Sequence, residues 1–192
     1  MKNQMSPESQ EVYDVICKVG SLTDAQVALI DRTNNAETTV KFLDRYNFTK
    51  HIGDNYIVPF FKKTENYSSV ACMWVLLNLI SNAEGLIDHD KLDTLIEGNS
   101  VINFSYIHDD SKVINFVYLD EGFHSKIAAI KQRFYDFTNC KPGEEKTAGI
   151  IHIFCTTNPE VFVKVSEIKL PLPHKLVLLE GDLAQKPTLK FA

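Results

Sequence analysis

The sequence predicts an α+β protein of two parts, and three observations support this. Two apolar strands with a helix between them, within residues 114–155, predict a parallel βαβ unit in the C-terminal half. Three short helices followed by a hairpin occupy residues 6–62. With 192 residues, 44% of them hydrophobic and 23% charged, the chain has the composition of a globular protein and room for one large core or two small ones.

The βαβ unit is recognised by its periodicity. Residues 114–119 and 150–155 are apolar on both faces of a strand, which is typical of a buried parallel sheet with cover on both sides. The helix between them, about Phe123 to Thr138, carries one apolar stripe at a 3.6-residue period, formed by Ile127, Ile130, Phe134 and Phe137. We expect this stripe to pack against the sheet.

The elements around this unit follow from alternation and from turn residues. Residues 101–107 and 112–119 predict an antiparallel hairpin, because polar turn residues separate two strand patterns. The tail, residues 185–192, has little to bury and is expected to be a loosely attached end. The remaining predictions are an apolar helix over 68–82 with Trp74 in the core, a short helix through Leu92 and Leu95 to Gly98, a helix that buries Val161, Phe162 and Val165, and a strand over 175–179.

The first two N-terminal helices are marked by their ends. Ser6-Pro7-Glu8 supplies a polar cap, a proline at the first helical position and an acid in the first turn, and Gly20 ends this helix. A second helix is predicted over residues 22–30. After the third helix, the hairpin is predicted to pair residues 48–52 with residues 56–60 across a Gly-Asp-Asn turn.

The third helix is expected to be the surface helix of this part. Asn34-Asn35 can cap it, and its apolar residues recur on one face. Three short helices followed by a hairpin is the order of a winged helix-turn-helix domain. The run SLTDAQVALI and the run ETTVKFLDRYNFTKHIGDNYIVPF resemble that family over residues 8–62.

This resemblance implies a DNA-binding surface. Thr38, Lys41 and Arg45 would face a major groove, while Lys50 and His51 on the wing would reach phosphates. Residues 1–63 contain eight Lys or Arg and eight Asp or Glu, so the domain is neutral and a weak DNA binder by this measure. The alternative, that Lys41 and Arg45 are only the solvated face of a packing helix, stays open.

The C-terminal half resembles a second family. A strand hairpin, an acidic loop, a helix with Lys126 and Lys131, and then GIIHIFCTTNPEVFVKV and HKLVLLEGDL, are similar to the nuclease-like core of the replication-relaxation protein family. In that family a winged helix precedes a domain related to the PD-(D/E)xK nucleases. The resemblance implies an α/β nuclease-like domain with a mixed sheet over residues 68–184, led by the apolar helix.

The sequence departs from the catalytic pattern of that family. Asp120 matches its last acid, but Tyr118 stands where a glutamate would be and Gly98-Asn99 stands where proline and aspartate would be; Lys126 or Lys131 matches its lysine. Magnesium-dependent cleavage needs at least two converging carboxylates, and Asp120 and Glu121 are adjacent and would diverge on a strand. We therefore predict a degenerate site of Asp120, Glu121 and Lys126 without catalysis or metal.

Other features bound the function. The sequence has no glycine-rich phosphate loop, its four cysteines lack metal-binding spacing, and no apolar run is long enough for a membrane span. We expect a cytoplasmic, non-catalytic regulator or accessory factor without a cofactor, which binds double-stranded DNA, can form a homodimer, and serves plasmid or mobile-element replication or transfer as the resemblance implies. The alternatives are a metal-dependent nuclease that uses Asp120, Glu121 and Lys126, and an adaptor that binds proteins only.

Overall fold

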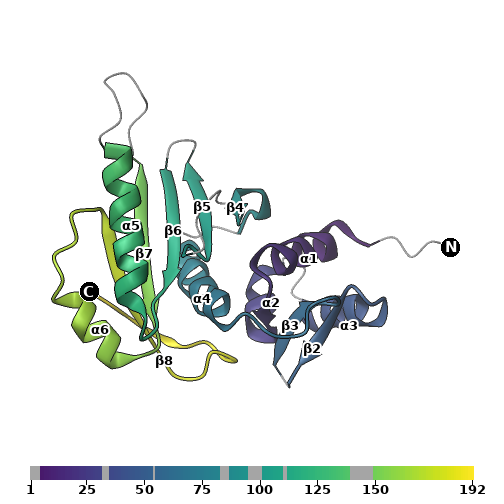
Figure 1. Cartoon of the computed structure of the whole chain (residues 1–192). Coiled ribbons are helices and arrows are strands. Elements are labelled where there is room, and N and C mark those ends of the chain that lie inside the picture. The colour runs from purple at the N-terminus through teal and green to yellow at the C-terminus, as the bar shows by residue number, and fades with distance from the viewer. Residues whose placement is uncertain are drawn as a thin grey trace. The chain divides into compact units, whose positions relative to one another are not determined.

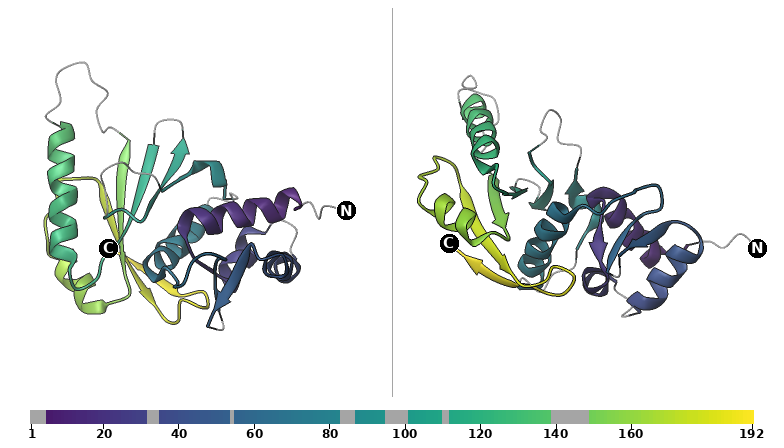
Figure 2. Two further views of the ribbon diagram at one scale, coloured as in Figure 1. Left: turned by 45° about the vertical axis from the view of Figure 1, so that its right-hand side comes forward. Right: turned by 60° about the horizontal axis from the view of Figure 1, so that its bottom comes forward.

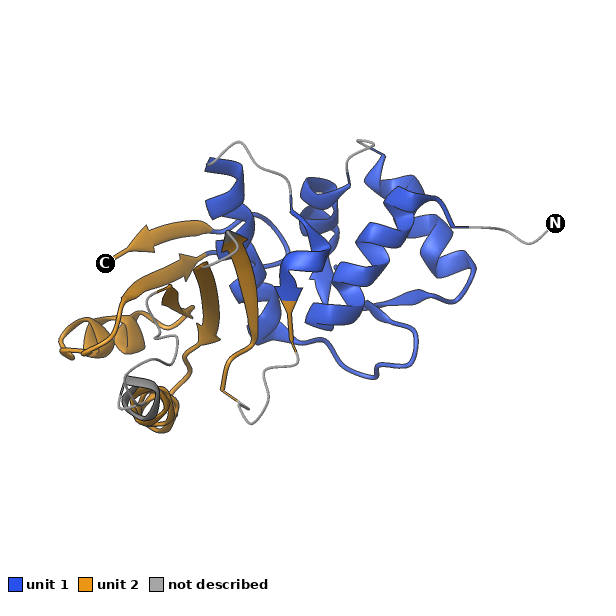
Figure 3. Cartoon of the chain, turned by 90° about the horizontal axis from the view of Figure 1, so that it is seen from above, with its two compact units in different colours: residues 1–92, 181–187 blue, residues 93–180, 188–192 orange. Residues whose placement is uncertain are grey.

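The α+β class is confirmed by a computed structural model, which describes residues 5–31, 35–53, 55–82, 87–94, 101–109, 112–138 and 149–192. The chain divides into two compact units (Figure 3). Unit 1 is Met1–Leu92 with Gly181–Pro187, and unit 2 is Asp93–Glu180 with Thr188–Ala192. The apolar helix expected to lead the second domain therefore belongs to unit 1, and so does a loop from near the C-terminus.

Unit 1 begins with helices and a small sheet (Figure 1). Its three strands form an antiparallel sheet in the order β1-β3-β2. The elements in chain order are α1 (Pro7–Val19), β1 (Leu22–Thr23), α2 (Asp24–Ile30), α3 (Ala36–Arg45), β2 (Thr49–Ile52) and β3 (Tyr56–Pro59). The helices and the hairpin predicted here are all present.

The ends of α1 are those that the sequence predicts. The Ser6 hydroxyl accepts a hydrogen bond from the Ser9 N–H at 3.2 Å, which satisfies one of the free donors of the first turn. Pro7 occupies the first helical position, where its missing N–H costs nothing. Gly20 ends the helix at φ +87°, a left-handed conformation that favours glycine.

The second helix was predicted to begin too early. Leu22 and Thr23 form the strand β1, which pairs with Ile57 and Tyr56 of β3. The helix α2 begins only after Thr23, because Thr23 and Gln26 form a capping box in which each side chain binds the other residue's backbone N–H at 3.1 Å. The polar cap thus sets the start of the helix, and pairing with β3 makes the two preceding residues a strand.

The helix α4 (Tyr67–Asn82) is buried on nearly all sides. Trp74 is 2% exposed, so its predicted place in a core is confirmed. Its indole N–H donates to the Leu183 carbonyl at 2.8 Å, a bond that connects the loop Gly181–Pro187 to unit 1. None of the helices in the described segments has the length and apolar character that crossing a membrane requires.

The second sheet has six strands in the order β4-β5-β6-β7-β8-β9. β5 pairs antiparallel with β6, β6 and β7 pair in parallel as predicted, and β8 continues the parallel part. The elements in chain order are a 3-10 turn (His89–Lys91), β4 (Leu92–Asp93), β5 (Phe104–Asp109), β6 (Lys112–Tyr118), α5 (Phe123–Thr138), β7 (Ile150–Thr156), α6 (Pro159–Ser166), β8 (His174–Glu180) and β9 (Thr188–Phe191).

Two predictions at the margins of this sheet were wrong. Leu92 lies in β4 rather than in a helix; the rest of that predicted helix, Leu95 to Gly98, lies outside the described residues. The tail is not a loose end, because β9 pairs antiparallel with β8 and the backbones of Leu176 and Ala192 exchange two hydrogen bonds at 3.0 and 3.2 Å. A short edge strand is held by hydrogen bonds to the neighbouring strand rather than by burial, and the composition of the tail does not reveal that neighbour.

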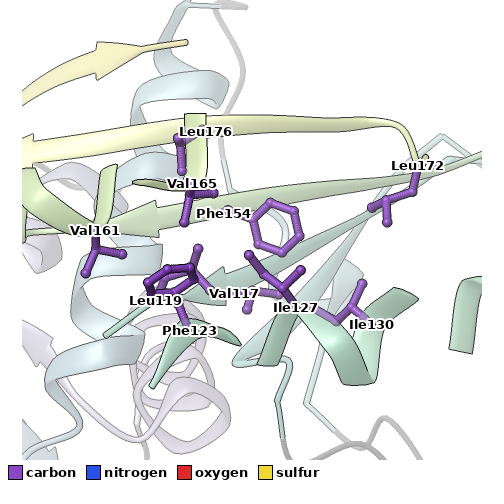
Figure 4. Packing of buried hydrophobic residues seen from close by; sticks show 10 residues of the cluster. All are labelled: Val117, Leu119, Phe123, Ile127, Ile130, Phe154, Val161, Val165, Leu172 and Leu176. Carbon is purple, nitrogen blue, oxygen red and sulfur yellow. The ribbon is translucent and has the colours of Figure 1, made fainter. Parts of the chain in front are cut away.

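The core of unit 2 lies between the sheet and the two helices α5 and α6, which share one face of it (Figures 1 and 2). Ile127 and Ile130 of the predicted stripe are buried there, whereas the side chains of Phe134 and Phe137 fall outside the described part. Figure 4 shows the packing around Phe154. The opposite face also carries fully buried side chains, such as Phe116, so the strands are apolar on both faces as predicted.

Candidate nucleic-acid interface

The outer face of α3 carries the three side chains that were predicted to meet DNA. Thr38, Lys41 and Arg45 are spaced three and four residues apart and are all exposed. Val40 and Leu43 lie on the opposite side of the helix and are buried. The 3.6-residue period therefore brings the predicted residues together on one solvent-exposed face.

The two cations of this face already have neighbours on their own helix. The Lys41 ammonium forms an ion pair with Glu37, one turn earlier. The hydrogen bond from Lys41, and then its charge, lower the pKa of the Glu37 carboxyl. The Arg45 guanidinium lies 5.9 Å from the centre of the Tyr46 ring. Because the pair of Lys41 with Glu37 is exposed, the ammonium can exchange this partner for a phosphate at little cost.

The wing residues Lys50 and His51 have different surroundings. The Lys50 ammonium lies 5.6 Å from the centre of the Phe60 ring. His51 lies between two carboxylates, with Nδ1 2.7 Å from Asp44 and Nε2 3.3 Å from Asp24. These acids would repel a phosphate at the same place. The arrangement favours a phosphate contact by Lys50 and speaks against one by His51.

These neighbours favour the charged form of the His51 imidazole. Burial lowers the pKa of His51, but the hydrogen bonds to Asp24 and Asp44 and their negative charges outweigh burial, so that the pKa is raised above its ordinary value. Because the pKa of His51 is higher in the folded than in the unfolded state, protonation stabilises the fold. This stabilisation is fully present when the pH is below the pKa of the unfolded state, and it is lost as the pH rises through the pKa of the folded state.

We predict a pH-dependent cost for His51→Gln. The substitution should lower the free energy of unfolding by about 0.2–1 kcal/mol per lost pair near pH 5.5, because the pairs exist only with a protonated imidazole. Near pH 8.5 the cost should fall, which urea unfolding at about these two pH values can measure. His108→Gln is the matched control, since His108 is exposed and forms no ion pair with a described residue. An equal cost at both pH values would contradict the assignment.

A pocket of about 400 Å³ lies between α2, α3 and β2. Its floor is apolar and its rim carries both signs of charge; it is lined by Asp24, Ala28, Ala36, Glu37, Val40, Lys41 and His51. The side of α3 that faces α2 thus carries Asp24 and Glu37 beside Lys41 and His51.

The predicted degenerate nuclease site is only partly assembled. The Lys126 ammonium lies 2.8 Å from the Asp120 carboxylate and donates to the Tyr118 carbonyl at 3.0 Å. The hydrogen bond from Lys126 is the main reason why the pKa of Asp120 is lowered. Glu121 is exposed and forms no ion pair with a described residue. The structure brings Asp120 and Lys126 together, and Glu121 stays apart.

Tyr118 stands where the resemblance to the replication-relaxation family implies a glutamate, and its side chain contacts a hydroxyl. The Tyr118 hydroxyl lies 2.7 Å from the Thr157 hydroxyl. Gly98-Asn99, the counterpart of the proline and aspartate, lies outside the described residues. Across the described ranges, no group of three or more His, Cys, Asp or Glu side chains could hold a metal ion.

A buried polar row crosses unit 2 and was not predicted. Ser105, Asn115 and His152 are register neighbours on β5, β6 and β7. The Ser105 hydroxyl donates to the Asn115 side-chain oxygen at 2.5 Å, and the Asn115 amide nitrogen lies 3.4 Å from His152 Nε2. Nδ1 of His152 is buried and has no hydrogen-bond partner among the described residues. Burial lowers the pKa of His152 to about 4, so the imidazole is neutral near pH 7.

The outer face of α3 is thus an exposed polar face of a helix. Thr38, Lys41 and Arg45 supply a hydroxyl and two cations on α3, and Lys50 lies on the neighbouring strand. Side chains of this kind donate to phosphates and to the edges of bases. Compared with protein-family models, with curated proteins and with solved structures, the chain matches none of them.

Proposed function

We propose that this protein is a non-catalytic factor that binds double-stranded DNA through the outer face of α3. The single observation that carries the proposal is the shared exposure of Thr38, Lys41 and Arg45 on one face of that helix. A helix of 10 residues that presents such side chains can enter a major groove, where its cations meet phosphates and its polar groups meet base edges.

The arrangement of unit 1 supports this proposal. Its elements follow in the order α1, β1, α2, α3, β2 and β3, and α2 and α3 pack on each other. This is the order expected of a winged helix-turn-helix domain, in which the second of these two helices reads the groove. In this proposal Lys50 on β2 adds a phosphate contact. The plasmid or mobile-element setting rests on the family resemblance alone.

We expect the double variant Lys41→Ala/Arg45→Ala to bind duplex DNA more weakly by about 1–3 kcal/mol at low salt. If both side chains contact phosphates, the slope of log K against log salt should become shallower by about 1.8, because each contact contributes about 0.9. Fluorescence anisotropy of a labelled duplex across a salt series from about 50 to 200 mM measures both effects.

A matched control is the double variant Lys164→Ala/Lys190→Ala. It removes the same charge from two exposed ion pairs of unit 2, those with Glu160 and Glu180. An equal loss of affinity in this control would show that only net charge matters and would overturn the proposal. Absence of binding by the unaltered protein at the lowest salt would leave an adaptor role instead. Shortening of the duplex in the presence of Mg²⁺ would contradict the non-catalytic assignment.

A further inference from the structure

One corner of unit 1 exposes aromatic and cationic side chains together. Phe61 is 72% exposed, Phe60 49% and Tyr46 37%. Exposed apolar side chains are common one at a time, whereas a group of them in one place marks an interaction site. We name this surface the aromatic corner and define it by Arg45, Tyr46, Lys50, Phe60, Phe61, Lys62 and Lys63.

Backbone pairing brings the two segments of the aromatic corner side by side. Thr49 opposes Pro59 in the β2–β3 pair, and the Phe60 N–H donates to the Phe48 carbonyl at 3.0 Å. The end of α3 reaches the same place through Asn47, whose φ of +58° allows a tight turn into β2. Residues 48–50 therefore lie beside residues 58–60, and the chain then turns, because the Lys62 N–H donates to the Pro59 carbonyl at 2.9 Å.

Ring contacts connect one side of this corner with the β2–β3 pair. The Phe42 ring lies 4.8 Å from the Tyr46 ring and 6.4 Å from the Phe48 ring, centre to centre. Phe48 in turn opposes Phe60 through the backbone bond described above. The partly buried rings of Phe42 and Phe48 thus extend from the exposed Tyr46 ring to the strand residue that faces Phe60.

Positive charge is concentrated at this corner. Residues 45–50 and 59–63 contain four Lys or Arg, at positions 45, 50, 62 and 63, and no Asp or Glu. Residues 1–63 as a whole contain eight of each sign, so the other 52 positions carry four cations and eight acids. Lys62 and Lys63 are exposed and form no ion pair with a described residue. Residues 1–63 are thus neutral as a whole, but their positive charge is concentrated in residues 45–50 and 59–63 and the remaining positions carry an excess of acids.

The cations lie against the rings rather than apart from them. The ammonium of Lys50 is within cation–π distance of Phe60, and the guanidinium of Arg45 is within cation–π distance of Tyr46. An apolar protein partner that covered these rings would also have to bury the charges without compensation. A nucleic acid offers both matches, since its bases stack on rings and its phosphates neutralise cations.

We propose that the aromatic corner binds unpaired DNA, with bases stacked on Phe60 and Phe61 and phosphates held by Lys50, Lys62 and Lys63. This inference rests on the proposed function, which supplies DNA as the partner. It adds that the DNA is a duplex that continues into a single strand. Arg45 belongs to both surfaces. A duplex on α3 and an unpaired extension at the corner can therefore be parts of one bound DNA.

The test compares a blunt duplex with the same duplex extended by a short thymidine overhang. The unaltered protein should bind the extended duplex more tightly, and Phe61→Ala should remove about 5- to 150-fold of affinity for the overhang while leaving the blunt duplex unaffected. Phe191→Ala is the matched control, because Phe191 on β9 is a 47% exposed phenylalanine of unit 2. Both substitutions remove an exposed ring, so both variants should keep the fold.

A second readout locates the contact directly. An overhang that contains 5-iododeoxyuridine should crosslink under light to the peptide that holds Phe60 and Phe61, and Phe61→Ala should reduce that crosslink. Equal affinities for the two duplexes, or an equal effect of Phe61→Ala and Phe191→Ala, would overturn the inference. Self-association that Phe61→Ala abolishes would also overturn it, because the corner would then join two copies of the chain.

The two proposals fail in different ways. Binding of a single-stranded oligonucleotide that is lost in Phe61→Ala, without binding of the blunt duplex, would sink the duplex proposal and keep this inference. Binding of the blunt duplex that depends on Lys41 and is not strengthened by an overhang would support the duplex proposal and overturn this inference.

Discussion

Phe154→Ala should lower the free energy of unfolding by about 3–5 kcal/mol, because the variant leaves a cavity at the centre of the unit 2 core. The ring of Phe154 is fully buried among side chains of β6, α5 and β8, including Val117, Ile127 and Leu176 (Figure 4). These neighbours belong to elements held by the rest of the sheet. They cannot collapse into the space without breaking other contacts.

Urea unfolding followed by far-UV circular dichroism measures this effect. Tryptophan fluorescence is unsuitable as the only probe, because the single tryptophan, Trp74, reports on unit 1. Phe191→Ala is again the control, and its exposed ring should cost no more than about 0.5 kcal/mol. A cost for Phe154→Ala close to that of the control would contradict the packing described here.

Acidification should destabilise the unaltered protein through His152, and His152→Gln should remove that sensitivity. The unfolded imidazole binds its proton near pH 6.5, while the folded one does so only near pH 4. Stability is therefore fully present above about pH 6.5 and is lost as the pH falls towards 4. The loss approaches about 3 kcal/mol, since each pKa unit corresponds to about 1.4 kcal/mol.

The measurement is the free energy of unfolding at several pH values between these limits, for the unaltered protein, His152→Gln and the control His174→Gln. His174 occupies the neighbouring register position on β8 but is exposed. Glutamine at position 152 can still accept a hydrogen bond from the Asn115 amide group. The variant should lose some packing at neutral pH, and its free energy of unfolding should depend less on pH under acidic conditions. An acid dependence that is unchanged by His152→Gln, or reduced equally by His174→Gln, would show that another group is responsible.

The sequence predicted best the elements whose pattern is local. α5 spans Phe123–Thr138 as expected, because its stripe repeats over about three turns and needs no partner to be recognised. β6 and β7 were predicted for the same reason. β1 was missed because two residues carry no period, and Leu22–Thr23 become a strand only by pairing with β3 far along the chain. β9 was missed because its partner, β8, is what makes it a strand.

The same distinction applies to the candidate sites. The outer face of α3 follows from helical spacing alone, so Thr38, Lys41 and Arg45 could be placed together. The partners of His51 could not be predicted, because Asp24 is 27 residues away and meets it only in the folded unit. Ser105, Asn115 and His152 lie in one row because of the register in which their strands pair. A slip of one residue in that register would turn a strand's side chains to the opposite face of the sheet.

The loop Gly181–Pro187 has a consequence for how the protein can be made and divided. A nascent chain that has released its first 92 residues still lacks the Leu183 carbonyl to which the Trp74 indole donates. Unit 1 can be completed only after residues 181–187 have left the ribosome, although residues 1–92 are synthesised before them. A fragment that ends at residue 92 therefore lacks part of unit 1, and expressing unit 1 alone would require residues 181–187 to be joined to it by a linker.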